Sequence, residues 1–169
     1  SKLVANLISA SGASRVMTMD LHAPQIQGFF DIPVDHLDGS VIFIPYIRSL
    51  NLDNIVIASP DIGGSKRTRS YANHMEADMV ICDKHRKKAN QVATMSVIGD
   101  VKDKNVVLVD DIIDTGGTLV QAAKIMKEQG AKSVRACITH PLLSGNAIEK
   151  IENSVLEELV VCDTIPVRQ

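Results

Sequence analysis

The sequence predicts an α/β fold built on a doubly wound parallel sheet, and two observations predict it. Apolar runs of strand length occur at Ile55–Ser59, 106–109 and 133–139. Segments with helical apolar spacing lie between such runs, for example 118–129, after which Gly130 supplies a helix stop. Because strands that alternate with helices form parallel βαβ units, ligands are expected in the crevice beyond the carboxyl ends of the strands.

The first part of the chain lacks this alternation and is expected to be a separate piece. Its elements are predicted from apolar spacing and from a proline suited to a first helical turn. In order they are a helix over 3–8 that stops at Gly12, a strand over Val16–Met19, a short helix over 24–27 closed by Gly28, and a connection over 29–38. That connection holds Pro33 and three aspartates, so it marks the boundary between predicted domains 1–37 and 38–169.

The second part carries the alternating elements, each predicted from its apolar spacing and from the residues at its ends. The expected series is a helix over 39–50 with an irregularity at Pro45, a strand over Ile55–Ser59, a helix over 65–76, a strand over 79–82, a polar segment over 84–91, an extended segment over Thr94–Ile98, a strand over 106–109, a helix over 118–129, a strand over 133–139, a helix over 146–153 and a strand over 159–162.

Composition narrows the class of protein. The 169 residues are 45% apolar and 22% charged, which is ordinary for a globular protein. A net charge of −2 argues against a general nucleic-acid binder, and no apolar run approaches the ~18 residues of a membrane span. The cysteines are odd in number and lie in or beside apolar runs, so we expect reduced, buried thiols and a cytoplasmic location. They are Cys82, Cys137 and Cys162.

Carboxylates and a glycine turn follow one another after the most apolar strand. The turn 115–118, Thr-Gly-Gly-Thr, leads into a helix whose exposed N–H groups and dipole suit a phosphate. Asp110 and Asp111, at the strand end, suit hydroxyl donors or a hard cation such as Mg²⁺. A ribose 5-phosphate group has a phosphate for the turn and hydroxyls for the aspartates, so it suits both parts of the stretch. The alternative is a plain strand-to-helix turn, in which aspartates cap the helix and glycines close it.

The stretch 106–119 resembles the phosphoribosyl pyrophosphate (PRPP) motif, which type I phosphoribosyltransferases and PRPP synthetases share. Other stretches, in order along essentially the whole chain, resemble the PRPP synthetase family, the ribose-phosphate pyrophosphokinases. They are 18–35, Ser-Pro-Asp-Ile-Gly-Gly at 59–64, Asp-Lys-His-Arg at 83–86, and Gly-Asn-Ala at 145–147 after Thr-His-Pro at 139–141. The resemblance implies a sheet of the type I phosphoribosyltransferase-like kind.

The resemblance also implies an activity. Members of the family transfer the β,γ-diphosphoryl group of ATP to the 1-hydroxyl of ribose 5-phosphate with Mg²⁺, giving PRPP and AMP for nucleotide biosynthesis. They have two similar domains and assemble as hexamers built from dimers, so a homo-oligomer is expected. Here 1–37 would be the tail of the N-terminal domain and 38–169 most of the C-terminal domain. The 169 residues are therefore expected to be a fragment that is inactive by itself.

Site residues carry over from the resemblance at matching positions. His22 and Asp61 match positions used around Mg–ATP, as nucleotide and metal ligands. Without the resemblance, His22 reads as a structural, hydrogen-bonded residue and Asp61 as a helix cap. The ribose 5-phosphate loop is matched by Asp110, Asp111, Asp114, Thr115, Gly116, Gly117 and Thr118.

Lys84 and Arg86 match the catalytic basic pair of the family on a mobile loop. Side chains two apart on an extended segment point the same way, so both can reach a triphosphate. Phosphoryl transfer depends mainly on positioning and on neutralising phosphate charge, which suits a lysine and an arginine. The alternative for this polar segment is the solvated tip of a hairpin.

Two further functions stay open. A nucleobase phosphoribosyltransferase would use the same loop with PRPP as its substrate, but the sequence offers no candidate segment for contacting a base. A non-catalytic sugar-phosphate-binding fragment or regulatory homologue would keep the loop without turnover.

Overall fold

The computed structural model describes residues 1–85 and 94–167, and the chain divides into two compact units, Ser1–Val41 and Ile42–Gln169. In the described residues, no helix combines the length and apolar character needed to cross a membrane. The three cysteines are free thiols and buried, as predicted.

The first unit contains a helix, a 3₁₀ helix and a parallel pair of strands. These are α1 (Lys2–Ala10), β1 (Val16–Met19), η1 (Pro24–Phe29) and β2 (Val34–Leu37). The prediction of a connection over 29–38 is therefore wrong at β2. Asp35 and His36 hide the strand pattern in the sequence, yet both contact the first strand region. Asp35 forms an ion pair of 2.7 Å with Arg15, and His36 Nδ1 lies 3.1 Å from Thr18 Oγ1.

The second unit is built on a six-stranded sheet of order β5-β4-β3-β6-β7-β8. All neighbouring strands are parallel except β4 and β5, which form an antiparallel pair. The strands are β3 (Ile55–Ser59), β4 (Asp78–His85), β5 (Thr94–Ile98), β6 (Asn105–Ile113), β7 (Ser133–Pro141) and β8 (Glu158–Val161). Each predicted strand of this region is present, and the doubly wound sheet is confirmed.

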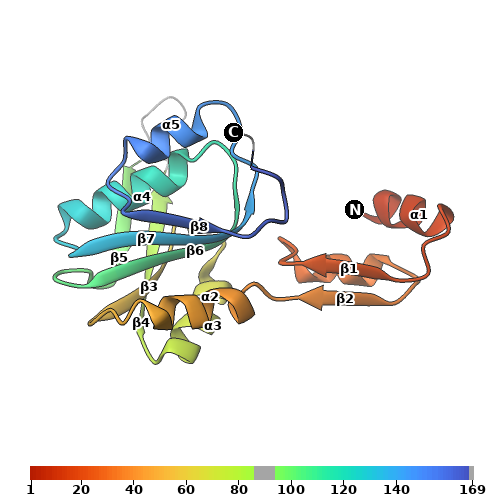
Figure 1. Cartoon of the computed structure of the whole chain (residues 1–169), viewed down its shortest axis with the longest axis horizontal. Coiled ribbons are helices and arrows are strands. Elements are labelled where there is room, and N and C mark those ends of the chain that lie inside the picture. The colour runs from red at the N-terminus through yellow and green to blue at the C-terminus, as the bar shows by residue number, and fades with distance from the viewer. Residues whose placement is uncertain (86–93, 168–169) are drawn as a thin grey trace. The chain divides into compact units, whose positions relative to one another are not determined.

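Helices cover both faces of this sheet. Helices α4 and α5 lie on one face, and α2 and α3 lie on the other (Figure 1). Their bounds are α2 (Ser40–Ser49), α3 (Ser65–Met75), α4 (Gly117–Glu128) and α5 (Ala147–Glu152). The predicted helices are thus confirmed to within two residues at each end.

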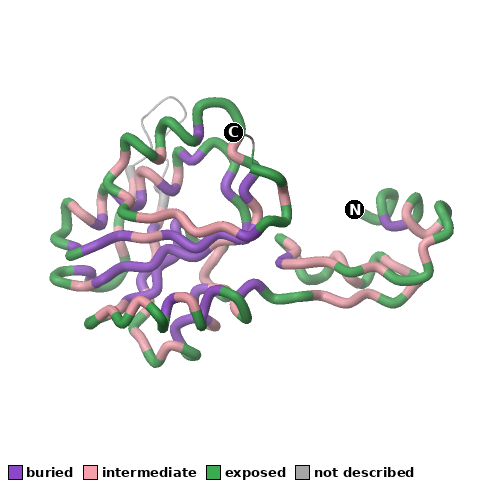
Figure 2. The backbone as a smooth tube through the Cα atoms, viewed as in Figure 1, coloured by how far each residue is buried: buried purple, intermediate pink, exposed green. Residues whose placement is uncertain are grey.

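The core lies around the central strand β6, which is drawn almost wholly as buried (Figure 2). Apolar residues at i, i+3, i+4 and i+7 form the buried face of α4, namely Leu119, Ala122, Ala123 and Met126. Val106 and Leu108 of β6 belong to the same buried cluster, and both have no measurable exposure. The sheet and α4 are therefore held together by continuous apolar packing, which fixes the strand ends.

Strands β4, β6 and β7 are longer than predicted, and the extensions of β6 and β4 affect the site. Strand β6 continues to Ile113, so Asp110 and Asp111 lie within the strand and not beyond it. The backbone of Asp110 pairs with β7 despite the side-chain charge, as the register Asp110↔Ile138 shows, and the pairing resumes at Ile112↔His140. Strand β4 continues to His85, so Lys84 is a strand residue paired with Met95 of β5.

Candidate functional site

The sheet has a topological switch point between β3 and β6. From these two strands the order runs outward in opposite directions, to β4 and β5 on one side and to β7 and β8 on the other. Ligands of open α/β sheets bind beyond the carboxyl ends of the strands at such a point. Here the loops 60–64 and 114–116 leave β3 and β6, and each leads into the first turn of a helix.

The loop after β6 presents backbone N–H groups at the start of α4. Its N-cap is Gly116, which has a left-handed backbone with φ of 72°. The first helical hydrogen bond runs from the Val120 amide to the Gly116 carbonyl. Because the amides at a helix start precede these internal bonds, they are directed at whatever lies in front of the helix. Thr115 and Gly117 are exposed and Thr118 is half-buried, so an anion can reach this turn.

The loop is supported from the segment that follows β7. The amides of Leu142 and Leu143 donate to the Ile113 carbonyl at 3.0 and 3.1 Å, and the Ser144 amide donates to the Asp114 carbonyl at 3.0 Å. Lys150 Nζ donates to the Thr115 carbonyl at 3.3 Å. These contacts hold carbonyl oxygens on the far side of the turn and so fix its orientation. The N-cap of α4 is Gly116 and not an aspartate, which differs from the alternative in which aspartates cap this helix.

Asp110 and Asp111 form a close acidic pair at the end of β6. Oδ1 of Asp110 accepts the Asp111 amide at 2.9 Å, and Oδ1 of Asp111 accepts Arg67 Nη1 at 3.1 Å. The side chains are 20% and 7% exposed, respectively. Burial raises the pKa of Asp110 to about 7, and the side-chain hydrogen bond with Asp111 and the charges of Asp111 and Asp61 act in the same direction. The bond from the Asp111 amide acts in the opposite direction and does not outweigh them.

Arg67 is a site residue that the sequence analysis missed. It lies in the first turn of α3, and its Nη1 is also 3.7 Å from Asp110 Oδ1. The contact joins residues 44 positions apart, so no local pattern indicates it. One signal was available: the first turn of α3 carries Lys66 and Arg67 and no acidic residue, the reverse of what a helix dipole favours.

Asp61 lies in the loop between β3 and α3. Its Oδ1 accepts the Gly64 amide at 3.1 Å, and its carbonyl accepts the Ser59 hydroxyl at 2.5 Å. The carboxylate thus supports the loop before α3, but the N-cap of α3 is Gly64, so Asp61 is not the helix cap itself. It remains exposed, and its charge is felt at Asp110, so Asp61 and the acidic pair share one corner of the sheet.

The structure brings together only part of the predicted site. Asp61, Asp110, Asp111 and the turn 114–118 lie at the carboxyl ends of β3 and β6. His22 belongs to the first unit, where it follows β1. Lys84 is placed by its backbone on β4, and Arg86 lies outside the described residues. Among the residues that are described, no group of three or more His, Cys, Asp or Glu side chains is arranged to hold a metal ion.

A family model described as Phosphoribosyl synthetase-associated domain matches residues 85–169, just over half of the chain. The chain belongs to this family. The matched part of the phosphoribosyl synthetase-associated domain includes β6, the acidic pair and the glycine turn, whereas Asp61 and Arg67 precede it. The resemblance predicted from the sequence is confirmed.

Two relatives with matches along nearly the whole chain are both named ribose-phosphate pyrophosphokinase. The chain is 62% identical to the ribose-phosphate pyrophosphokinase of Campylobacter jejuni over 99% of its length and 54% of that protein. It is 55% identical to the enzyme of that name from Porphyromonas gingivalis, over 98% of the chain and 53% of the relative. The chain therefore spans about half the length of the curated relatives it matches.

Solved structures support the fold. The phosphoribosylpyrophosphate synthetase of Mycobacterium smegmatis matches with a TM-score of 0.92 and 36% identity, over 99% of this chain and 55% of that one. The purine phosphoribosyltransferase of Pyrococcus horikoshii matches with a TM-score of 0.55 and 20% identity, over 93% of this chain and 99% of that one. The second match concerns the fold alone, which is of the predicted phosphoribosyltransferase-like kind.

Proposed function

We propose that the chain is part of a ribose-phosphate diphosphokinase, which transfers the β,γ-diphosphoryl group of ATP to the 1-hydroxyl of ribose 5-phosphate. The observation that carries the proposal is the pairing, at one switch point, of two carboxylates with a glycine turn at a helix start. The relatives named ribose-phosphate pyrophosphokinase support the reaction. The products would be PRPP and AMP.

In the proposed ribose 5-phosphate site, the amides at the start of α4 bind the 5-phosphate. Thr115 and Thr118 add hydroxyl donors, and Gly116 and Gly117 allow the backbone to approach the anion closely. Asp110 and Asp111 of β6 accept hydrogen bonds from the ring hydroxyls, and Asp114 lies in the loop that follows this strand. The two carboxylates therefore bind the hydroxyl end of the ligand, and the amides at the start of α4 bind its phosphate end.

In the proposed transfer step, the 1-hydroxyl attacks the β-phosphorus in line with the departing AMP oxygen. Lys84 and Arg86 neutralise the charge that spreads over the phosphorus oxygens, and this positioning and charge stabilisation supply most of the catalysis. Lys84 lies on the β4–β5 hairpin, one strand away from β3 and the Asp61 loop.

Magnesium would enter the proposed site as a complex with ATP. Mg²⁺ commonly binds through one or two carboxylates together with substrate phosphates, and it does not need a complete protein cage. The exposed carboxylate of Asp61 supplies such an oxygen. When bound, Mg²⁺ neutralises phosphate charge and orients the triphosphate.

The proposal extends to the complete gene product. Residues 1–37 would belong to an N-terminal phosphoribosyltransferase-like domain, and 38–169 would form most of the C-terminal one. Homo-oligomers, specifically hexamers built from dimers, would complete the ATP site between subunits. Both substrates and three free thiols suit a cytoplasmic enzyme.

Calorimetry with ribose 5-phosphate tests the sugar site directly on the 169 residues. An Asp110→Ala/Asp111→Ala double variant should bind at least about tenfold more weakly, because hydrogen bonds to charged groups contribute about 1.5–3 kcal/mol each. Asp100→Ala, a change to an exposed carboxylate that precedes β6, serves as the control. Equal affinity of the double variant and the control would reject the assignment.

A product assay separates the reactions. AMP formation from ATP and ribose 5-phosphate by the complete gene product indicates a diphosphokinase, whereas pyrophosphate release from PRPP with a nucleobase indicates a phosphoribosyltransferase. The chain spans about half the length of its relatives, which favours a second reading for the 169 residues alone: they bind ribose 5-phosphate but form little PRPP. Robust AMP formation by the 169 residues would contradict this reading.

A further inference from the structure

Arg67 occupies an unusual position for an arginine. Its side chain is only 19% exposed, although arginine is a residue that rarely lies away from water without a partner. It also lies in the first turn of α3, where the helix dipole disfavours a positive charge. Neither burial nor helix stability explains why an arginine lies at this position. The explanation must therefore lie in the groups that Arg67 contacts.

Among the described residues, Arg67 is paired with both carboxylates of the acidic pair. The Nη1 atom donates to Asp111 Oδ1 at 3.1 Å and lies 3.7 Å from Asp110 Oδ1, so one guanidinium nitrogen stands between two neighbouring acids. Asp111 is the more buried of the two, with a side chain 7% exposed. Two buried carboxylates side by side repel each other, and a cation between them offsets this repulsion.

The approach of α3 to the acidic pair depends on Gly64. A Cβ atom at this position would lie 2.4 Å from Ser59 Oγ and 3.9 Å from Asp110 Oδ1. Real Cβ contacts are not this short, so the absence of a side chain lets the start of α3 pack against the ends of β3 and β6. The backbone is therefore built to bring Arg67 within reach of the carboxylates.

We infer that Arg67 is a positioning residue, which holds Asp110 and Asp111 in the orientation that recognises the 2- and 3-hydroxyls of the sugar. This inference rests on the proposed function, because it gives a role to a residue behind the same ribose 5-phosphate site. The phosphate end of that site, at the start of α4, has its own supports from 142–151 and does not use Arg67. Loss of Arg67 should therefore harm hydroxyl recognition and spare phosphate binding.

Comparison of ribose 5-phosphate with 2-deoxyribose 5-phosphate isolates this effect. The two ligands share the phosphate and differ in one hydroxyl, so the ratio of their dissociation constants, measured by calorimetry, reports the acidic pair. The unaltered chain should prefer the ribose by roughly tenfold or more, the effect of one hydrogen bond to a charged group. Arg67→Ala should reduce the ratio to about one to three, with the deoxy ligand bound almost as before.

Two matched variants complete the experiment. Arg69→Ala removes the same charge from the same helix, two residues further on. Arg69 is exposed, so its removal should leave the ratio unchanged. Arg67→Lys keeps the charge but loses the planar guanidinium, and it should recover part of the preference. Circular dichroism melts establish that each variant is folded.

The outcomes separate the two hypotheses. If the unaltered chain binds neither sugar phosphate, the proposed function fails at its ribose site. If it binds both and prefers the ribose, but Arg67→Ala keeps that preference, the function stands and the role of Arg67 is wrong. Equal weakening of both ligands by Arg67→Ala also overturns the inference, because a direct phosphate contact or a general structural role would produce it.

Discussion

Replacing Asp110 with asparagine should stabilise the protein above neutral pH. The carboxyl of Asp110 is largely buried beside Asp111, and burial raises its pKa to about 7. Arg67 Nη1, 3.7 Å away, does not outweigh burial and the negative charges of Asp111 and Asp61. Asparagine has the same shape, can accept the Asp111 amide as the aspartate does, and never ionises. The substitution therefore removes the cost of a charge and keeps the geometry.

The sign of the effect follows from proton linkage. The folded-state pKa of about 7 lies above the ordinary value of 3.8, so the stability given by the neutral carboxyl is fully present below about 3.8 and is lost as pH rises through 7. At about 1.4 kcal/mol for each pKa unit, the complete loss amounts to roughly 4 kcal/mol. Part of it occurs below pH 5, which leaves on the order of 2–3 kcal/mol between pH 5 and pH 8.

Chemical denaturation at several pH values measures this difference. The gap in unfolding free energy between Asp110→Asn and the unaltered chain should grow in favour of the variant from pH 5 to pH 8. In a thermal melt the same gap corresponds to roughly 5–10 °C in Tm at pH 8. Asp114→Asn, at an exposed position in the loop after β6, serves as the control. Parallel stability curves for Asp110→Asn and the unaltered chain would refute the reasoning.

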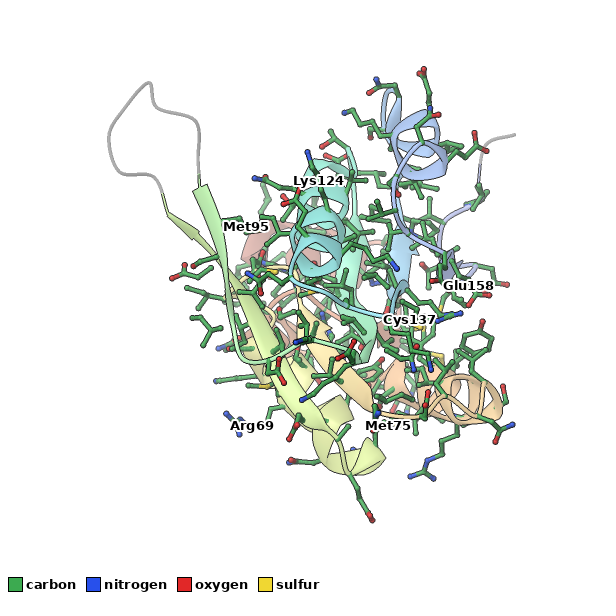
Figure 3. The ribbon with its side chains drawn as sticks, turned by 90° about the vertical axis from the view of Figure 1, so that its left-hand side faces the viewer. Arg69, Met75, Met95, Lys124, Cys137 and Glu158 are labelled. Carbon is green, nitrogen blue, oxygen red and sulfur yellow. The ribbon has the colours of Figure 1, made fainter. Side chains whose placement is uncertain are left out.

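Three further changes probe other parts of the molecule. Lys84→Ala in the complete gene product should lower turnover about 10²–10³-fold with little change in the KM for ribose 5-phosphate, because it removes charge stabilisation of the transition state; near-normal AMP formation would contradict this. Gly116→Ala should destabilise the fold by about 1–2 kcal/mol, because φ is 72° there, whereas Gly117→Ala, with open space at the Cβ position, should not, as denaturation curves will test. Met126→Ala should cost about 2–5 kcal/mol of unfolding free energy, because the side chain is fully buried, and Lys124→Ala on the exposed face of α4 (Figure 3) should cost little.

The elements around the glycine turn were predictable because their signals are local. The apolar run of β6, the spacing of the buried residues of α4 and the glycine stop all lie within a short window of sequence. The alternation of strands and helices predicted a parallel sheet with a ligand crevice beyond the carboxyl ends of its strands. The strand order, which places the switch point between β3 and β6, was not predicted. The apolar run of β6 also places the acidic pair at a strand end. It ends the strand too early, because two aspartates conceal the continued pairing with β7.

Features that depend on distant partners escaped the sequence analysis. Strand β2 is short and half polar, and only its pairing with β1 makes it a strand. The pairing of Arg67 was missed for the same reason: its partner Asp111 lies 44 positions away, and the close approach of α3 depends on Gly64. The basic first turn of α3 was the single local signal. Gly64 itself was noticed only as part of a family motif. The physical reason for a glycine at this position, a clash between a Cβ atom and Ser59, is visible only in the folded structure.

The acidic pair and the phosphate turn are compatible because they are separated along one strand. Asp110 precedes Ile113, the last residue of β6, by three positions, which at about 3.3 Å per residue is roughly 10 Å. A pentose with its phosphate spans such a distance, so the hydroxyls and the anion meet different groups. Arg67 belongs to the hydroxyl end, since its Nη1 donates to Asp111 Oδ1 at 3.1 Å. An arginine that served the phosphate would have to leave the carboxylates, and the acidic pair would then lose the cation that holds it.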